Sequence, residues 1–178
     1  MRKGSSLAPY TIEDIEDIRR AGTFADSTRV AITALERLCE RKGKEEREAV
    51  PIGIITGPMH AVPGGESPAE KRQAMLRTAE FLSGRFDVRI FNYFPPRKRI
   101  VQILEHAFGD SWRNEDNLTL LFRVFYEPIL ETGLIRKVFF MPGWETSPVS
   151  RSIWAFANKN RIEAKFIPRE FIPKAAAK

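Results

Sequence analysis

The sequence predicts an α/β fold in which a parallel sheet carries helices on both faces and follows a helical N-terminal extension. Four short apolar runs are separated by segments of helical periodicity, and this alternation is typical of βαβ units. The chain has 178 residues, which is enough for one well-filled domain. We expect a helical extension over 1–50, an α/β domain over 51–168 and a tail over 169–178.

The extension has the pattern of two helices. Residues 11–47 show helical periodicity, with Thr11 and Asp14 spaced as in a capping box. Gly22 interrupts the pattern, and a second helix is expected after it. The charged run over 41–48 is either the solvated end of that helix or a linker. The two helices either cover a face of the sheet or form a dimer contact.

Strand and helix patterns alternate through the rest of the chain. Short apolar runs predict the strands, at 51–56, 87–93, 136–141 and 162–167. Amphipathic segments predict the helices, at 68–83, 97–108, 117–131 and 148–160. Pro128 lies inside the third of these helices and must kink or end it, because proline has no backbone N–H. With right-handed crossovers, this order predicts a flavodoxin- or Rossmann-like sheet.

The composition excludes several classes of protein. A chain with 43% hydrophobic and 29% charged residues is neither disordered nor fibrous, and no apolar stretch is long enough for a membrane helix. No apolar segment follows the basic N-terminus, so we expect no secretory signal. Cys39 stands alone and cannot form an internal disulfide, which fits a cytoplasmic location. Two histidines and one cysteine are too few for a metal cluster, so we expect neither metal nor cofactor.

The net charge of +6 is unevenly placed. The first 50 residues hold 10 basic and 10 acidic residues, so the rest of the chain carries the whole excess. A basic surface either indicates polyanionic partners, such as nucleic acid, nucleotides or phosphate groups, or has no function of its own. No recognised nucleic-acid motif accompanies the charge, so a nucleic-acid partner has the charge as its only support.

The candidate site lies at one edge of the predicted sheet. Ligands of open α/β sheets bind beyond the carboxyl ends of the strands, and three segments follow strand ends here, at 56–60, 92–94 and 142–147. The first of them continues into a long glycine-rich loop that could fold over a ligand. The candidate binding residues taken from these segments are Gly57, Pro58, Met59, His60, Asn92, Tyr93, Gly143, Trp144 and Ser147.

Several of these residues allow two interpretations. Ser147 is either the N-cap of the helix that starts at Pro148, or both a cap and part of an anion site at that helix N-terminus. Trp144, Tyr93 and the neighbouring Phe94 either stack on a flat base or pack in the core. The basic run over 97–99 either contacts phosphate or is a solvated helix start. In the first loop, the isolated His60 is a candidate acid or base.

Two motifs carry a family resemblance over residues 51–168. Gly57-Pro58-Met59 after the first strand, followed by a glycine-rich loop and a helix, resembles the opening of nucleoside 2-deoxyribosyltransferase-like proteins. The segment Val138–Ser147 resembles a phage-associated branch with a Gly-Trp-Glu-x-Ser loop. The resemblance implies a flavodoxin-like sheet, a nucleoside or nucleotide ligand, a homo-oligomer, and a role for Ser147 in holding a 5′-phosphate. Active members of this family cleave or transfer the N-glycosidic bond.

The chain departs from the family at the nucleophile. The family's glutamate attacks the anomeric carbon of the sugar, but the matching position here is Ile153, and a family glycine is replaced by Val149. We therefore expect a nucleotide-binding protein that binds or sequesters its ligand without classical transfer. A first alternative is an active N-glycosidase or transferase that uses a relocated carboxylate, Glu145 or Glu127. A second alternative is a basic nucleic-acid-binding protein.

Overall fold

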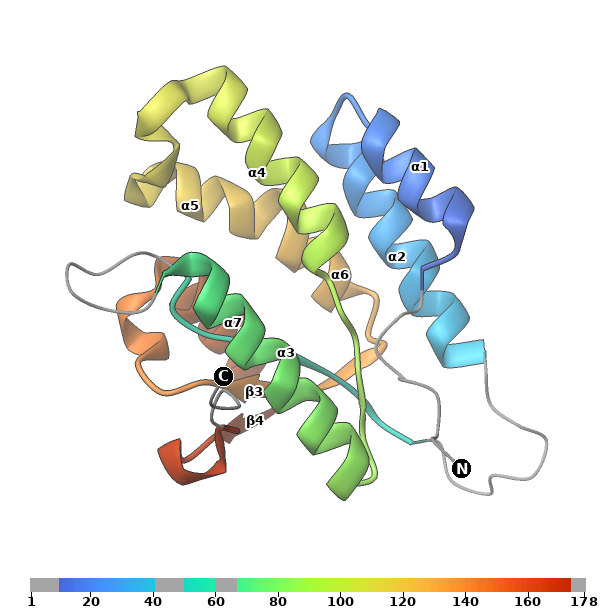
Figure 1. Ribbon diagram of the computed structural model, residues 1–178, viewed down its shortest axis with the longest axis vertical. Coiled ribbons are helices and arrows are strands. Elements are labelled where there is room, and N and C mark those ends of the chain that lie inside the picture. Colours follow the sequence, from blue (N-terminus) through green and yellow to red (C-terminus); the bar gives the residue numbers. More distant parts are fainter. Residues whose placement is uncertain (1–9, 41–49, 60–66, 174–178) are drawn as a thin grey trace, which may run out of the picture.

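The fold is α/β, as predicted, and is built on a four-stranded parallel sheet (Figure 1). The computed structural model describes residues 10–40, 50–59 and 67–173. The strands, paired in the order β2-β1-β3-β4, are β1 Ile52–Thr56, β2 Arg89–Ile90, β3 Ile135–Phe140 and β4 Glu163–Phe166. The α-helices are α1 Ile12–Arg20, α2 Phe24–Glu40, α3 Pro68–Arg85, α4 Phe94–Phe108, α5 Glu115–Leu121, α6 Glu127–Glu131 and α7 Pro148–Lys159.

Helices cover both faces of the sheet. The chain steps from β1 to β2 in one direction and from β2 to β3 and β4 in the other, so right-handed crossovers put α3 and α7 on opposite faces. Figure 1 shows α3 in front of the strands and α7 behind them. α3 contacts β1 and β2, whereas α7 contacts β3 and β4. The turn η4 (Arg169–Phe171) follows β4, and the ring of Phe171 packs against the Phe81 ring of α3, with centroids 6.5 Å apart.

The strands differ in burial according to their place in the sheet. All five residues of the inner strand β1 are buried, which explains its continuous apolar sequence. β2 is an edge strand and is shorter than the predicted 87–93. Its N–H groups at Arg89 and at the following Phe91 donate to Pro51 and Gly53, and the chain then turns away into α4. The other edge strand, β4, is the most exposed of the four.

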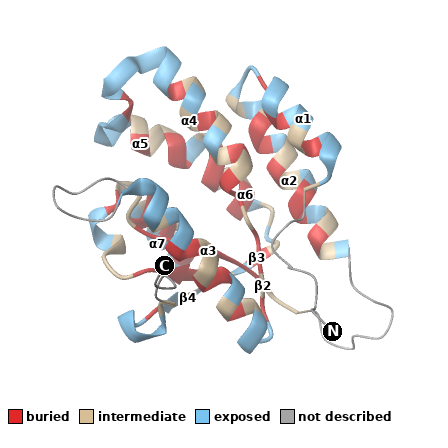
Figure 2. Cartoon of the chain, viewed as in Figure 1, coloured by how far each residue is buried: buried red, intermediate tan, exposed pale blue. Residues whose placement is uncertain are grey.

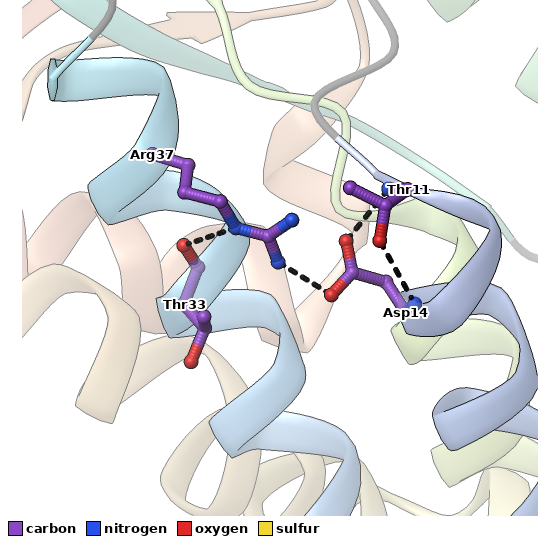
Figure 3. Close-up of polar contacts among 4 residues, drawn as sticks. All are labelled: Thr11, Asp14, Thr33 and Arg37. Carbon is purple, nitrogen blue, oxygen red and sulfur yellow. Dashed lines mark hydrogen bonds and ion pairs between the residues drawn. The ribbon is translucent and has the colours of Figure 1, made fainter.

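The predicted capping box at the start of α1 is confirmed, and it also joins α1 to α2 (Figure 3). The hydroxyl of Thr11 accepts from the Asp14 N–H at 3.1 Å, and the carboxylate of Asp14 accepts from the Thr11 N–H at 2.7 Å. The other carboxylate oxygen is hydrogen-bonded to the guanidinium of Arg37 on α2. Asp14 is 7% exposed, whereas the side chain of Arg37 is 31% exposed, so the ion pair is partly buried. Burial raises the pKa of Asp14, but the hydrogen bonds from Arg37 and Thr11 outweigh it and hold the pKa below its ordinary value.

The N-terminal helices pack against other helices. α2 lies beside α4 and contacts α6 and the turn before it, and Figure 1 shows α1 on the outer side of this pair. One hydrophobic core runs through both parts of the chain, since Leu35 of α2 and Ile54 of β1 belong to the same buried cluster. Figure 2 shows buried residues in the sheet and on the inward sides of the helices around it. The extension therefore completes the helical layer on one side of the molecule.

Pro128 neither ends the helical segment nor leaves it regular. A π-helical turn, Phe122–Tyr126, comes directly before α6, and the segment remains helical from Glu115 to Glu131. In an α-helix the carbonyl of Val124 would accept from the N–H of residue 128, which proline lacks. The hydroxyl of Thr28 on α2 donates to this carbonyl at 2.8 Å. The break in the α-helical pattern is thus accommodated by a π turn and a side chain from another helix.

Candidate functional site

A small cavity lies at the carboxyl ends of the strands, where the topology predicts a ligand site. We call it the β1–α7 cavity; its lining residues are Thr56, Gly57, Met59, Tyr93, Arg97, Tyr126, Ser147, Val149 and Ser150. Its volume is about 10 Å³, which is room for roughly one water molecule. Five hydroxyl groups and one guanidinium line it, and among the described residues no carboxylate does. Its chemistry therefore suits a negatively charged group.

One wall of the cavity is an aromatic pair held by an arginine. The rings of Tyr93 and Tyr126 meet edge to face, with centroids 5.2 Å apart, and both residues are buried. The Tyr93 hydroxyl donates to the Ile55 carbonyl at 2.6 Å, and the Tyr126 hydroxyl accepts from Nε of Arg97 at 2.8 Å. Burial raises the pKa of both tyrosines, so both hydroxyls stay protonated at neutral pH. Each remains a hydrogen-bond donor.

Arg97 brings positive charge to this wall. It is half-buried, and its guanidinium has no carboxylate partner among the residues that the structure describes. The two prolines at the start of α4 precede it and direct the chain away from the strand end. The neighbouring Lys98 is exposed, and Arg99 donates to the carbonyl of Ala21 at 2.8 Å. Of the basic run over 97–99, only Arg97 therefore lines the cavity.

The opposite wall is the N-terminus of α7. The Ser147 hydroxyl accepts from the N–H of Ser150 at 3.3 Å, which confirms the predicted N-cap. The Ser150 hydroxyl lies 3.0 Å from the Thr56 hydroxyl and donates to the Gly57 carbonyl at 3.3 Å. All three hydroxyl residues are buried. The first turn of α7 contains no acidic residue, so nothing in that turn offsets the partial positive charge of the helix N-terminus.

Two glycines shape the backbone near the cavity. A Cβ at Gly57 would lie 2.7 Å from Cβ of Met141, so the close approach of the β1 and β3 ends requires glycine there. Gly143 has a φ of +78° and starts the turn η3 (Trp144–Thr146), which leads into the cap of α7. Gly57 thus has a packing explanation and Gly143 a turn explanation, whereas the glycine-rich segment over 60–66, predicted to fold over a ligand, lies outside the described residues. Pro58 and Met59 follow Gly57 and are half-exposed, and of the two Met59 lines the cavity.

The remaining candidate binding residues lie elsewhere. The side chain of Asn92 accepts from the N–H of Phe94 at 3.1 Å and so caps the chain entering α4. Trp144 packs between Trp154 and Phe166, with centroids 5.8 and 5.7 Å from theirs, and does not line the cavity. Tyr93 and Phe94 remain in contact, with ring centroids 5.0 Å apart, whereas Trp144 lies away from them. His60 lies outside the described residues.

The two carboxylates of the catalytic alternative do not line the cavity either. Glu145 is exposed on η3, and its backbone carbonyl accepts from Arg151 at 2.9 Å. Glu127 is half-buried at the start of α6. Ile153, which the resemblance would place at the position of a nucleophile, is fully buried in the core, and Val149 lines the cavity. No carboxylate lines this cavity, as far as the structure describes the chain.

Sequence reasoning missed Ser150 and Tyr126, included Thr56 in a predicted segment without choosing it as a candidate, and left Arg97 undecided. Ser150 follows the predicted cap by three residues, and this spacing is the signal that could have placed it at the α7 N-terminus. Tyr126 comes from the π turn, whose position depends on Thr28 and Pro128, so no local pattern identifies it. Arg97 was one of three adjacent basic residues, and only the direction of α4 distinguishes it from its neighbours.

An open groove between helices is a different feature. It measures about 790 Å³, is open to solvent, and lies between α2 and α6. Its lining is mainly apolar, with Arg29 and Glu36 as its charged residues. It lies away from the strand ends and has no converging set of polar groups, so we do not assign it a site.

Further searches of the described residues are negative. They contain no cluster of three or more histidine, cysteine, aspartate or glutamate side chains arranged to hold a metal ion. Within the same residues, no helix combines the length and the apolar character needed to cross a membrane. Comparisons with protein-family models, curated proteins and solved structures return no match to the chain.

Proposed function

We propose that this protein binds a nucleotide, with the phosphate at the β1–α7 cavity, and that it does so without the glycosyl-transfer chemistry of the family it resembles. The observation that carries the proposal is the lining of the cavity: one arginine, five hydroxyls and no carboxylate among the described residues. The nucleoside part of the proposal depends on the motifs Gly57-Pro58-Met59 and Gly143–Ser147.

Electrostatics favour an anion at this place. The guanidinium of Arg97 and the N-terminus of α7 face the same small volume, and their positive charges add. A guanidinium held by a neutral hydroxyl, rather than by a carboxylate, keeps its charge uncompensated. The hydroxyl of Ser147, which is the acceptor in the α7 cap, has its own proton to donate to a phosphate oxygen.

The size of the cavity limits which part of a ligand enters it. Space for roughly one water molecule admits a phosphate oxygen but neither a sugar nor a base. In this arrangement the nucleoside lies outside the cavity, beside the half-exposed Met59. Recognition of the phosphate would then dominate the affinity, and differences between bases would be small.

The absence of transfer follows from the position of Ile153. A retaining mechanism needs a carboxylate that attacks the anomeric carbon. An isoleucine at that position cannot form the glycosyl ester, and Glu145 and Glu127 do not line the cavity. Bound nucleotide is therefore expected to keep its base.

The test measures binding and base release in the same samples. The purified protein is incubated with ribo- and deoxyribonucleoside monophosphates, the matching nucleosides and inorganic phosphate, followed by thermal unfolding and chromatography of the free base. Monophosphates at 100 times their Kd should stabilise the fold by about 2.7 kcal/mol, which raises Tm by roughly 5–11 °C. Nucleosides should give a much smaller shift, and no base should be released.

Three results would overturn the proposal. If no monophosphate raises Tm, the proposed anion site is refuted. Release of base that disappears in Glu145→Gln or Glu127→Gln means that a relocated carboxylate performs the chemistry. Stabilisation by oligonucleotides alone, with steep dependence on salt, indicates a nucleic-acid-binding protein instead.

A further inference from the structure

The outer edge of β4 has the backbone geometry of an open strand edge. In the described part of the chain β4 pairs with β3 only. The N–H of Ile167, directly after β4, donates to the carbonyl of Phe140 at 2.9 Å, so Glu163, Lys165 and Ile167 direct their backbone groups toward β3. Because the direction alternates along a strand, Ala164 and Phe166 direct their N–H and C=O groups outward. Such an edge can pair with a further strand.

Exposed aromatic rings adjoin this edge. Phe166 is 55% exposed although it packs on Phe140, with ring centroids 5.5 Å apart. Trp144 lies against Phe166, and Trp154 of α7, itself 40% exposed, lies against Trp144. Contiguous apolar surface beside an open strand edge is typical of an interaction surface.

The sequence of the edge is complementary to its own reverse. The residues from 162 to 166 are Ile, Glu, Ala, Lys and Phe. When two copies run antiparallel about Ala164, Glu163 of each copy faces Lys165 of the other, and Ile162 faces Phe166. Opposite charges and aromatic–β-branched pairs are the cross-strand combinations that stabilise an antiparallel pair.

We propose that β4 pairs antiparallel with β4 of a second copy of this chain, about a two-fold axis at Ala164, to form one continuous eight-stranded sheet. The occupant is a second copy because the charges complement each other in this register. Ala164 directs its backbone groups outward, so the pair on the axis is the hydrogen-bonded type.

The geometry of the register places the charges at close range. Glu163 and Lys165 flank the hydrogen-bonded pair, so they form the non-hydrogen-bonded pairs, in which Cα atoms lie only about 4.5 Å apart. The Glu163 carboxylate lies 3.2 Å from Nζ of Lys137 and 2.7 Å from Nζ of Lys165 in one chain. Both side chains already lie on the same face of the sheet, so on pairing Lys165 exchanges its partner for the glutamate across the axis. A shift of one residue would bring charged side chains to the face of Phe166.

Charge reversal tests the register. Sedimentation equilibrium should give a concentration-dependent dimer for the wild type and monomers for Glu163→Lys and Lys165→Glu, each of which faces like charges across the axis. A mixture of the two variants should dimerise again, because every lysine then faces a glutamate. Glu170→Lys makes the same charge change off the strand and should leave the dimer unaffected. Circular dichroism checks that each monomeric variant remains folded.

A cysteine on the axis tests the geometry independently. Hydrogen-bonded antiparallel pairs have Cα atoms about 5.5 Å apart, within the range of a disulfide. In a Cys39→Ser background, Ala164→Cys should therefore cross-link into a covalent dimer on mild oxidation, whereas Ser152→Cys on α7 should not. A wild type that stays monomeric at every soluble concentration, or a mixture of the two charge variants that fails to associate, would overturn the proposal.

Discussion

The hydrogen bond between Thr28 and the π turn before Pro128 allows the cost of removing it to be predicted. The hydroxyl of Thr28, which is 5% exposed, donates to the Val124 carbonyl that proline deprives of its α-helical donor. Thr28→Val keeps the shape of the side chain and removes this donor. Losing the hydrogen bond and leaving a partly buried carbonyl with one donor fewer costs about 1–3 kcal/mol. For a chain of this size the expected fall in Tm is about 2–4 °C for each kcal/mol, hence roughly 2–12 °C.

A double-mutant cycle isolates the cause. Pro128→Ala supplies an N–H that can donate to Val124, so Thr28→Val should cost less in that background, by about 1 kcal/mol or more. Thr33→Val makes the same substitution at an exposed position of α2 and should stay within about 0.5 kcal/mol of wild type. Urea unfolding of the four cycle members measures the coupling. Equal costs of Thr28→Val in both backgrounds would refute the role of the hydroxyl as a substitute donor.

Two further predictions concern the fold. Asp14→Asn should destabilise the protein by about 1–2 kcal/mol near pH 7, because it removes the charge that bonds to Arg37 and to the α1 cap. The pKa of Asp14 is lower in the folded than in the unfolded chain, so the stability difference between wild type and Asp14→Asn is full above the unfolded pKa of about 3.9 and disappears as the pH falls below it. Urea unfolding between pH 7 and 2.5 measures this difference, with the exposed Asp17→Asn as control. A stability difference that is independent of pH would contradict the prediction. Gly57→Ala should destabilise the protein by about 1–3 kcal/mol, because its Cβ would lie 2.7 Å from Cβ of Met141. A Cβ at Gly22 meets nothing within 4 Å, so Gly22→Ala should not destabilise the protein. Equal unfolding midpoints for the two variants would refute this steric explanation.

Sequence patterns predicted those features that depend only on neighbouring residues. The capping box at Thr11, the N-cap at Ser147 and the buried strand β1 each follow from residues within one turn or strand. The length of β2 was overestimated, because an apolar run over 87–93 is equally compatible with a short edge strand followed by a cap. Periodicity cannot tell these two apart.

The candidate site remains a prediction, but part of its residue set comes together in the structure. The strand-end rule selected Gly57, Met59, Tyr93 and Ser147, and these four residues line one cavity. It could not find Tyr126, because the direction of that side chain depends on a π turn stabilised by a distant helix. Long-range packing, rather than any motif, decides which residues meet there.

The contacts of Trp144 also depend on long-range packing that the loop sequence does not reveal. Its place in a loop after a strand suggested stacking on a ligand, but its neighbours are the rings of Trp154 and Phe166. Neither the side on which β4 adds to the sheet nor the exposure of that edge can be read from the loop sequence. The aromatic residues therefore separate into the cavity wall and the β4 edge.

Arg97 and the α7 N-terminus are proposed to hold a phosphate, and calorimetric titration of one arginine variant and one lysine variant tests this proposal. The titrant is the nucleoside monophosphate that gives the largest thermal shift. Arg97→Met should weaken binding by roughly 10- to 100-fold, the loss expected for a charge-assisted hydrogen bond of about 1.5–3 kcal/mol. Lys98→Met removes the same charge from the exposed neighbour and should change Kd by less than about threefold, because solvent and salt screen it. Equal effects of the two substitutions, or an unchanged Kd in Arg97→Met, would contradict the account.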